Sequence, residues 1–257
     1  MQSLPTKIQP ATGKNAFTLI EMLVVIAIMS ILMTAGSIGL SGMGGKGVTS
    51  GVATAESLFD EARTTAVGRN LRSCVLVAKQ LTNNPGDDLR RIVVGYEETE
   101  TNKSSPNYGQ AKDPDNANPR WVLSSRGATL PDQTFFSETL SSKNHSSGGG
   151  AIPEITDSKI VSAKNAYKGT YFIYQFNSQG ILIDPTSPNY QGGASFIIGS
   201  GTRNSSKPAT GSNSSPPRIM SSAKRDFGGF VIWRNGRTSV FRSPDQIGNI
   251  PSTGQTF

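Results

Sequence analysis

Residues 17–40 read FTLIEMLVVIAIMSILMTAGSIGL, an apolar run in which Glu21 is the only charged residue. A helix of this length reaches roughly 36 Å at ~1.5 Å per residue, against about 30 Å of bilayer hydrocarbon. We therefore predict a membrane-spanning helix over 17–40. An unpaired ionisable group near mid-membrane costs on the order of a few kcal/mol. Glu21 lies near the start of the run, and a carboxylate at this place calls for a specific role.

A short basic leader and a compact motif surround Glu21. Lys7 and Lys14 precede Ala16, and Phe17 then opens the sequence FTLIE. This arrangement resembles the class III signal of type IV pilins and type II secretion pseudopilins. The resemblance implies cleavage between Ala16 and Phe17 by the prepilin peptidase/methyltransferase, which would also methylate the new amine of Phe17. That family usually has glycine before the cut, where this chain has Ala16.

The position of the predicted cut determines the topology. An ordinary secretory signal loses its apolar core on cleavage, whereas here the core would stay with the mature protein. Lys7 and Lys14 favour a cytoplasmic amino terminus. We therefore expect a single-pass protein of the bacterial inner membrane with its carboxy-terminal head in the periplasm. The alternative is an uncleaved signal anchor, which makes the protein a simply membrane-anchored periplasmic domain.

The resemblance also implies a role for Glu21 in filament assembly. In filaments of that family, the acid of an incoming subunit faces the amino group of a neighbouring first residue. Pairing Glu21 with the Phe17 ammonium of another subunit would relieve the desolvation cost of both charges. The expected partners are other pseudopilins or pilins, contacted through this helix. The other interpretation is a glutamate that snorkels to the membrane surface.

Composition limits what the rest of the chain does. The net charge is +7, and it is +5 without residues 1–16, because that leader holds two lysines and no acidic residue. This excess suits anionic surfaces or nucleic acid without requiring either. Cys74 is the only cysteine, so no intramolecular disulfide forms and the fold must depend on its apolar core.

Four regions follow from these patterns: a leader at 1–16, a transmembrane helix at 17–40, a glycine-rich joint with an amphipathic helix at 41–70, and an exported β-rich head at 71–257.

We expect the glycine-rich part to be soft or locally unwound, as a deformable joint or, at Gly36, as a close helix contact. One apolar helical face then follows. It consists of Val48, Val52, Ala55, Phe59, Ala62 and Ala66. The helix should end near 68–70. The predicted fold class is α+β, with this long amino-terminal helix packed on an antiparallel sheet or small sandwich.

Short β-type runs fill the head. The predicted strands are 74–78, 91–96, 121–123, 169–176, 195–199, 229–233 and 238–242. Hairpins are expected at 171–183 and 230–241, the second with a type I′ turn at Asn235-Gly236. Three polar insertions, at 99–119, 141–150 and 200–218, should form exposed loops.

The order of these elements is similar to a narrower group. Residues 59–70, with the strand after them, look like the stem-to-head junction of the H-type minor pseudopilins and their FimT-like pilin relatives. The chain length and the Ser/Asn-rich insertions are also similar to the pilin-like proteins called Verru_Chthon cassette protein D. These resemblances imply a minor structural subunit of a type II secretion or type IV pilus-like machine, or a FimT-like minor pilin that takes up DNA.

Other candidate sites are weaker. His145 is the only histidine, so a zinc site or a Cys-His pair is not expected, and we predict neither catalysis nor a cofactor. Calcium could bind the oxygen-rich loop at 112–119, yet the EF-hand spacing fails and a plain turn-rich loop is the preferred interpretation. Its oxygen-bearing residues are Asp113, Asp115, Asn116 and Asn118.

A basic carboxy-terminal third, with aromatic residues between its cations, is the candidate DNA surface. Its proposed contacts are Arg234, Arg237 and Arg242; the alternative is an ordinary hairpin with outward arginines.

Overall fold

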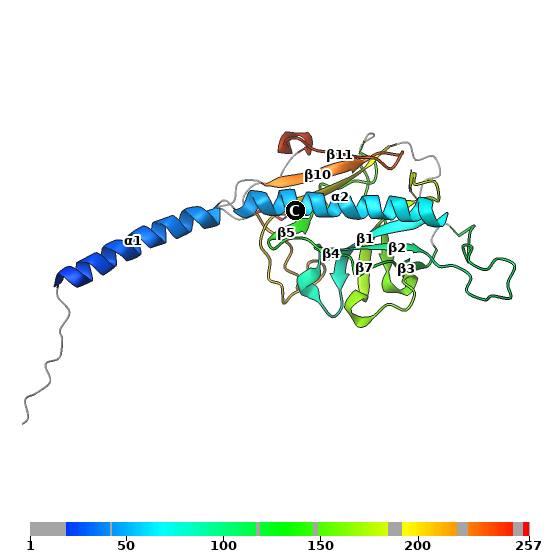
Figure 1. The fold of residues 1–257 in the computed structure, drawn as a ribbon, viewed down its shortest axis with the longest axis horizontal. Helices are drawn as coiled ribbons and strands as arrows, with labels where there is room; N and C mark the ends of the chain where they lie inside the picture. Colours follow the sequence, from blue (N-terminus) through cyan, green and yellow to red (C-terminus); the bar gives the residue numbers. More distant parts are fainter. Residues whose placement is uncertain are drawn as a thin grey trace, which may run out of the picture. The chain divides into compact units, whose positions relative to one another are not determined.

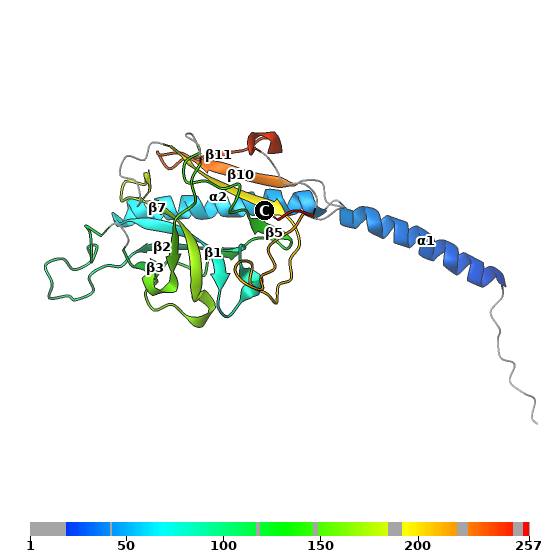
Figure 2. The same cartoon turned by 180° about the vertical axis from the view of Figure 1, so that it is seen from behind.

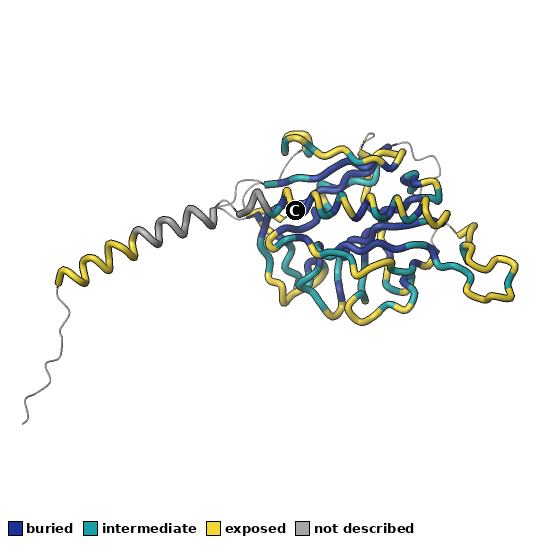
Figure 3. The backbone as a smooth tube through the Cα atoms, viewed as in Figure 1, coloured by how far each residue is buried: buried dark blue, intermediate teal, exposed yellow. Residues whose placement is uncertain are grey.

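The computed structural model describes residues 19–41, 43–116, 119–145, 149–184, 192–219, 226–248 and 254–256, without the side chains of 31–41, 43–46 and 244. The chain divides into two compact units, Met1–Gly42 and Met43–Phe257. In the first unit, α1 spans Leu19–Ser41. Its residues 19–30 are all exposed, as Figure 3 shows. Ser30 Oγ donates a hydrogen bond to the carbonyl of Ile26, which satisfies this hydroxyl inside the apolar helix.

Within the described side chains, no helix combines the length and the apolar character needed to cross a membrane. The predicted span 17–40 includes residues 17 and 18 and the side chains of 31–40, which lie outside the described part.

The second unit begins with α2, Met43–Arg69. All six residues of the predicted apolar face are buried. The helix ends as predicted: Asn70 has a φ of 53°, its N–H bonds the carbonyl of Val67, and the N–H of Leu71 bonds the carbonyl of Ala66. This pair of bonds is a Schellman C-cap. Residues 43–51 are helical, however, so the local unwinding predicted for the glycine-rich part is wrong over this range.

A large antiparallel sheet lies on one side of α2 (Figure 1). Its main strand order is β3-β2-β1-β7-β6, with β4 beside β2 and β8 beside β7. The strands are β1 Ser73–Leu81, β2 Arg91–Glu97, β3 Trp121–Leu123, β4 Ala128–Thr129, β6 Glu154–Thr156, β7 Gly169–Phe176 and β8 Leu182–Ile183. The central register places Val75 opposite Val94 on one side and Tyr174 on the other.

A smaller antiparallel sheet packs on the other side of α2, and Figure 2 shows the same arrangement from behind. Its order is β11-β10-β9-β5. The strands are β5 Thr134–Phe136, β9 Ala194–Ser200, β10 Phe227–Ile232 and β11 Thr238–Val240. Short 3₁₀ turns lie at Pro85–Asp87, Asp157–Lys159, Asn165–Tyr167 and Pro244–Gln246. The predicted α+β class, a helix packed on antiparallel sheets, is confirmed.

Phe59 of α2 lies at the centre of the main core. Its ring meets Tyr174 of the large sheet edge-on, with centroids 5.1 Å apart, and Phe196 and Phe230 of the small sheet at 5.5 and 5.2 Å. Edge-to-face contacts at these distances add to the free energy of apolar burial. One helical side chain therefore joins both sheets.

A second core, not predicted from the sequence, covers the far face of the large sheet. Because side chains alternate along a strand, Val75 and Val77 face α2 while Cys74 and Leu76 face the second core. Trp121, Ile155 and Ile160 complete this second cluster. Strand β1 is thus buried on both faces.

Seven predicted strands are present with small changes of boundary, and β4, β5 and β6 were missed. Both hairpins form, but the type I′ turn at 235–236 is wrong. Gly236 has a φ of 76°, whereas Asn235 is not among the residues with positive φ. The Trp233 N–H bonds the carbonyl of Arg237, and the Gly236 N–H bonds the carbonyl of Trp233. This is a three-residue loop ending in a G1 bulge.

Candidate functional site

Glu21 lies in the first turn of α1. Large exposed apolar side chains surround it on the same helix, among them Leu19, Ile20 and Met22, exposed to 84%, 70% and 53%. Ala16 and Phe17, the predicted cleavage and methylation residues, lie outside the described residues. Of the predicted pair between Glu21 and the Phe17 amine, the structure therefore describes only Glu21. The side chains around it on α1 are apolar.

The β10–β11 hairpin carries the predicted basic surface. Arg234 and Arg237 flank its turn and Arg242 follows β11, and all three are exposed. Trp233 is 40% exposed and donates its indole N–H to Ser239 Oγ at 2.9 Å. Lys224 and Arg225, which belong to the same predicted basic third, lie outside the described residues.

The aromatic residues of this region do not share the exposure of its arginines. Phe227 and Phe230 are buried in the main core, and Phe241 packs partly against it. Among Phe227, Phe230, Trp233 and Phe241, which lie between the cations of this region, only Trp233 is exposed. The hairpin is thus a cationic surface with one accessible aromatic ring.

Two tight turns meet over Arg63 of α2. Gly180 has a φ of 72°, and its loop repeats the hydrogen-bond pattern of the Gly236 loop. A Cβ on Gly236 would lie 2.8 Å from Arg63 Cδ and 2.2 Å from the Gly180 carbonyl oxygen, so only glycine fits. The N–H of Leu182 also bonds the carbonyl of Arg234. These contacts fix the hairpin relative to the large sheet and α2.

Arg72, between α2 and β1, organises the loop 112–119, the candidate calcium site. Its guanidinium makes two bonds to the Glu97 carboxylate, at 2.5 and 2.8 Å, and donates to the carbonyls of Asp113 and Asn116. Asp113, Asp115 and Asn116 are exposed, and Asn118 lies outside the described residues. Over the described part of the chain, no cluster of acidic, His or Cys side chains could hold a metal ion. A guanidinium thus binds the carbonyl groups of this loop.

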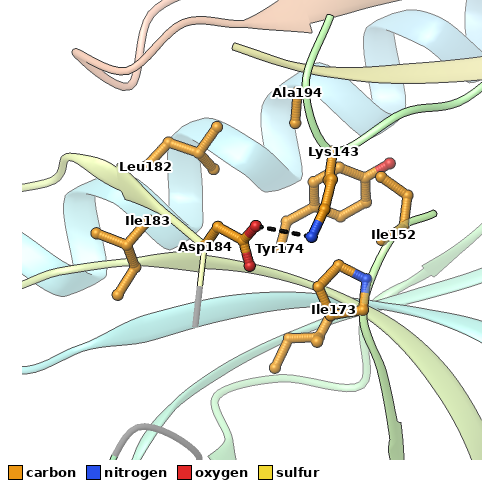
Figure 4. A pocket seen from close by; sticks show the side chains of 9 residues that line it. Lys143, Ile152, Ile173, Tyr174, Leu182, Ile183, Asp184 and Ala194 are labelled. Carbon is orange, nitrogen blue, oxygen red and sulfur yellow. Dashed lines mark ion pairs between the residues drawn. The ribbon is translucent and has the colours of Figure 1, made fainter. Parts of the chain in front are cut away.

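A second ion pair closes a small pocket beside the large sheet (Figure 4). Lys143 Nζ lies 3.1 Å from Asp184 Oδ2, over a lining that includes Ile173, Tyr174 and Leu182. The cavity holds about 20 Å³, room for about one water molecule. This pair ties the 141–150 insertion to the residue that follows β8, so that insertion is not simply an exposed loop.

The 200–218 insertion is anchored even more deeply, contrary to the predicted exposed loop. Arg203 and Asp88 lie 3.7 Å apart with side chains 1% and 0% exposed. Asp88 accepts the N–H groups of Leu81 and Ala209 at 2.7 and 2.9 Å. Burial raises the pKa of the Asp88 carboxyl, and burial lowers the pKa of the Arg203 guanidinium. No pattern in the sequence distinguishes Arg203 from Lys207 and Arg218 of the same segment, so the sequence carries no signal for this contact.

The other singled-out residues have structural positions. Cys74 is fully buried in the second core, and this burial raises the pKa of its thiol. His145 is exposed, its backbone N–H bonds the carbonyl of Gly193, and its ring lies 5.7 Å from that of Phe241. Cys74 and His145 therefore belong to different surroundings, the first inside the fold and the second on its surface.

Comparison with known proteins identifies the amino-terminal segment. Residues 12–37 match the prokaryotic N-terminal methylation motif. No curated protein and no solved structure matches the chain. The match includes Ala16, Phe17 and Glu21, and implies processing by prepilin peptidase and membrane anchoring through the amino-terminal segment before assembly. Proteins with this motif are generally structural rather than enzymatic. The chain therefore carries the N-terminal methylation signal of the type IV pilin and pseudopilin class.

Proposed function

We propose that this protein is a minor pseudopilin or pilin-like structural subunit of a type II secretion or type IV pilus-like machine. The methylation motif at 12–37 carries the proposal. The mature chain would begin at Phe17 with a methylated amine. Its helix would sit in the inner membrane with the head in the periplasm, and would then enter a periplasm-spanning filament beside other pseudopilins or pilins.

The chemistry of α1 supports this assignment. A carboxylate among exposed apolar side chains is costly in lipid and in a dry helix bundle. An ammonium group from another subunit relieves that cost when the two charges meet. In this proposal Glu21 pairs with the Phe17 amine of a neighbouring subunit. Methylation leaves that amine basic, so the ion pair survives the modification.

Replacing Glu21 tests the assembly role. Glu21→Ala and Glu21→Val should be processed and inserted normally but should lose most crosslinks to partner subunits, because the Phe17 amine is left without its counter-charge. Ser30→Ala is the control on the same helix, since it removes a hydroxyl that donates to the carbonyl of Ile26 one turn earlier and leaves the charge of Glu21 in place. Normal crosslinking of either Glu21 variant would contradict the role.

DNA uptake is a second candidate function, favoured by the exposure of Arg234, Arg237 and Arg242. Phosphate contacts of this kind produce binding that weakens as salt rises. DNA binding by the full-length protein in detergent, lost when Arg234 and Arg237 are changed to glutamine, would support it. Absence of binding at low salt would remove it. The burial of Phe227 and Phe230 leaves Trp233 alone for base stacking, so we favour the structural subunit.

A further inference from the structure

We propose that the free edge of β11 binds an extended acidic segment of another protein, by adding a strand to the small sheet. This inference does not depend on the amino-terminal motif. It rests on one edge strand whose outer backbone groups have no partner within the described residues, on the cations at its two ends, and on the side-chain bonds that hold it in place.

Strand β11 is the outer strand of the small sheet and pairs only with β10 in the described part of the chain. The N–H of Trp233 bonds the carbonyl of Arg237, and the N–H of Phe241 bonds the carbonyl of Gly229. Because such bonds alternate along an antiparallel pair, the N–H and C=O groups of Ser239 point toward β10. The N–H and C=O groups of Thr238 and Val240 then point to the free edge. Unpaired groups in this row are a template for another strand.

The side chains of β11 hold that edge in place. Thr238 Oγ1 donates to Glu56 Oε1 of α2 at 2.5 Å, and Ser239 Oγ accepts the Trp233 indole N–H at 2.9 Å. Val240 is 47% exposed beside this edge. An edge that is already ordered has little conformational entropy left to lose when a partner binds.

Charge selects the partner. Arg237 precedes β11 and Arg242 follows it, and no ion pair joins either residue to an acidic side chain in the described part of the chain. Two arginines therefore stand before and after the strand, while the nearby Glu56 carboxylate already accepts a hydrogen bond from Thr238 Oγ1. The two arginines favour carboxylates on the added strand. A second copy of this chain is a poor occupant, because its net charge is +7.

The edge also distinguishes a peptide from DNA. An added peptide strand supplies both N–H donors and C=O acceptors, which match the alternating groups of Thr238 and Val240. A phosphate backbone supplies only acceptors and would leave the outward carbonyl groups of β11 unpaired. The observations therefore favour a protein segment over nucleic acid.

The test uses the full-length protein in detergent with three fluorescent probes. These are a Thr/Val-rich peptide carrying glutamates, the same peptide with lysines in their place, and a double-stranded DNA oligonucleotide. The glutamate peptide should bind most tightly. Arg237→Glu should weaken this binding by about tenfold or more, whereas Lys103→Glu, an equal charge change on an exposed lysine elsewhere, should leave it unchanged.

Val240→Pro tests the strand-pairing geometry. The substitution removes the Val240 N–H, which points away from β10, so the hairpin keeps its own hydrogen bonds. Peptide binding should be lost, because the added strand needs that N–H as a donor. Val240→Thr is the matched control and should bind normally. The proposal is overturned if both peptides bind equally, if Val240→Pro binds like Val240→Thr, or if DNA binds through Arg237 and displaces the glutamate peptide.

Discussion

Arg72, which lies between α2 and β1, contacts residues 25 to 44 positions further along the chain. It pairs with Glu97 of β2 and binds carbonyl groups of the 99–119 insertion. Glu97 is only 2% exposed, so its carboxylate depends on this guanidinium for compensation. Backbone hydrogen bonds pair the two sides of the insertion. The N–H of Glu100 donates to the carbonyl of Gln110, and the N–H of Lys112 donates to the carbonyl of Glu98.

Replacing Arg72 should therefore open this insertion. Removing one partner of a buried ion pair costs about 3–5 kcal/mol, so Arg72→Met should speed hydrogen exchange at Glu100 and Lys112, measured by mass spectrometry. Lys103→Met, on the exposed tip, should change nothing. A metal chelator should also leave exchange in the unmodified protein unchanged, and faster exchange on chelation would show that calcium rather than Arg72 holds the loop.

At the scale of one element, close packing of α2 against β9 explains why Gly51 occurs inside this helix. A Cβ on Gly51 would lie 2.8 Å from Ile198 Cδ1 and 3.4 Å from Pro131 Cδ, whereas a Cβ on Gly68 would meet nothing within 4 Å. Gly51 thus lets the helix approach β9 closely. The sequence pattern alone suggested a flexible joint here, because it shows the helical cost of glycine and not the neighbour that requires it.

The two glycines should respond differently to the same substitution. Gly51→Leu should lower the free energy of unfolding by about 1–3 kcal/mol, the usual cost of overpacking. Gly68→Leu should leave it equal or raise it by up to ~1 kcal/mol, because leucine is the better helix former. Denaturant unfolding followed by circular dichroism measures both. Equal effects at the two positions would contradict the close contact with Ile198.

Prediction at the element scale succeeded where the signal was local. The 3.6-residue spacing of Val48 to Ala66 and the long β runs identified α2, β1 and β7. Strands β4, β5 and β6 have only two or three residues, too few for a period to be read. The turn at Asn235-Gly236 was misassigned because Asn-Gly suits both turn types. The turn that forms packs closely against Arg63 and Gly180, a contact that the local sequence does not show.

At the scale of the whole molecule, ion pairs between distant segments hold the polar insertions on the two-sheet head. Arg203 is the clearest case, since it also donates to the carbonyls of Pro85, Ser215 and Lys207. No residue pattern within 200–218 indicates that Arg203, rather than Arg218, meets Asp88 of a different segment. The amino-terminal motif was predictable because its chemistry lies in consecutive residues, whereas these pairs appear only in three dimensions.

Arg203→Met should destabilise the head by about 3–5 kcal/mol, because it leaves the buried carboxylate of Asp88 uncompensated. Arg218→Met is the matched control, since Arg218 is exposed on the same insertion; it should cost less than about 0.5 kcal/mol. Denaturant midpoints of the two variants give the comparison. A similar loss in both would mean that the insertion, rather than the buried pair, sets the stability.

The intact mass of the protein extracted from its native membrane tests the central claim most directly. We predict a chain that begins at Phe17, shorter by residues 1–16 and heavier by one methyl group, with the methyl located on the amino-terminal peptide by fragmentation. A protein that still begins at Met1 would contradict the account, because Glu21 would then have no processed amino terminus to meet in a neighbouring subunit.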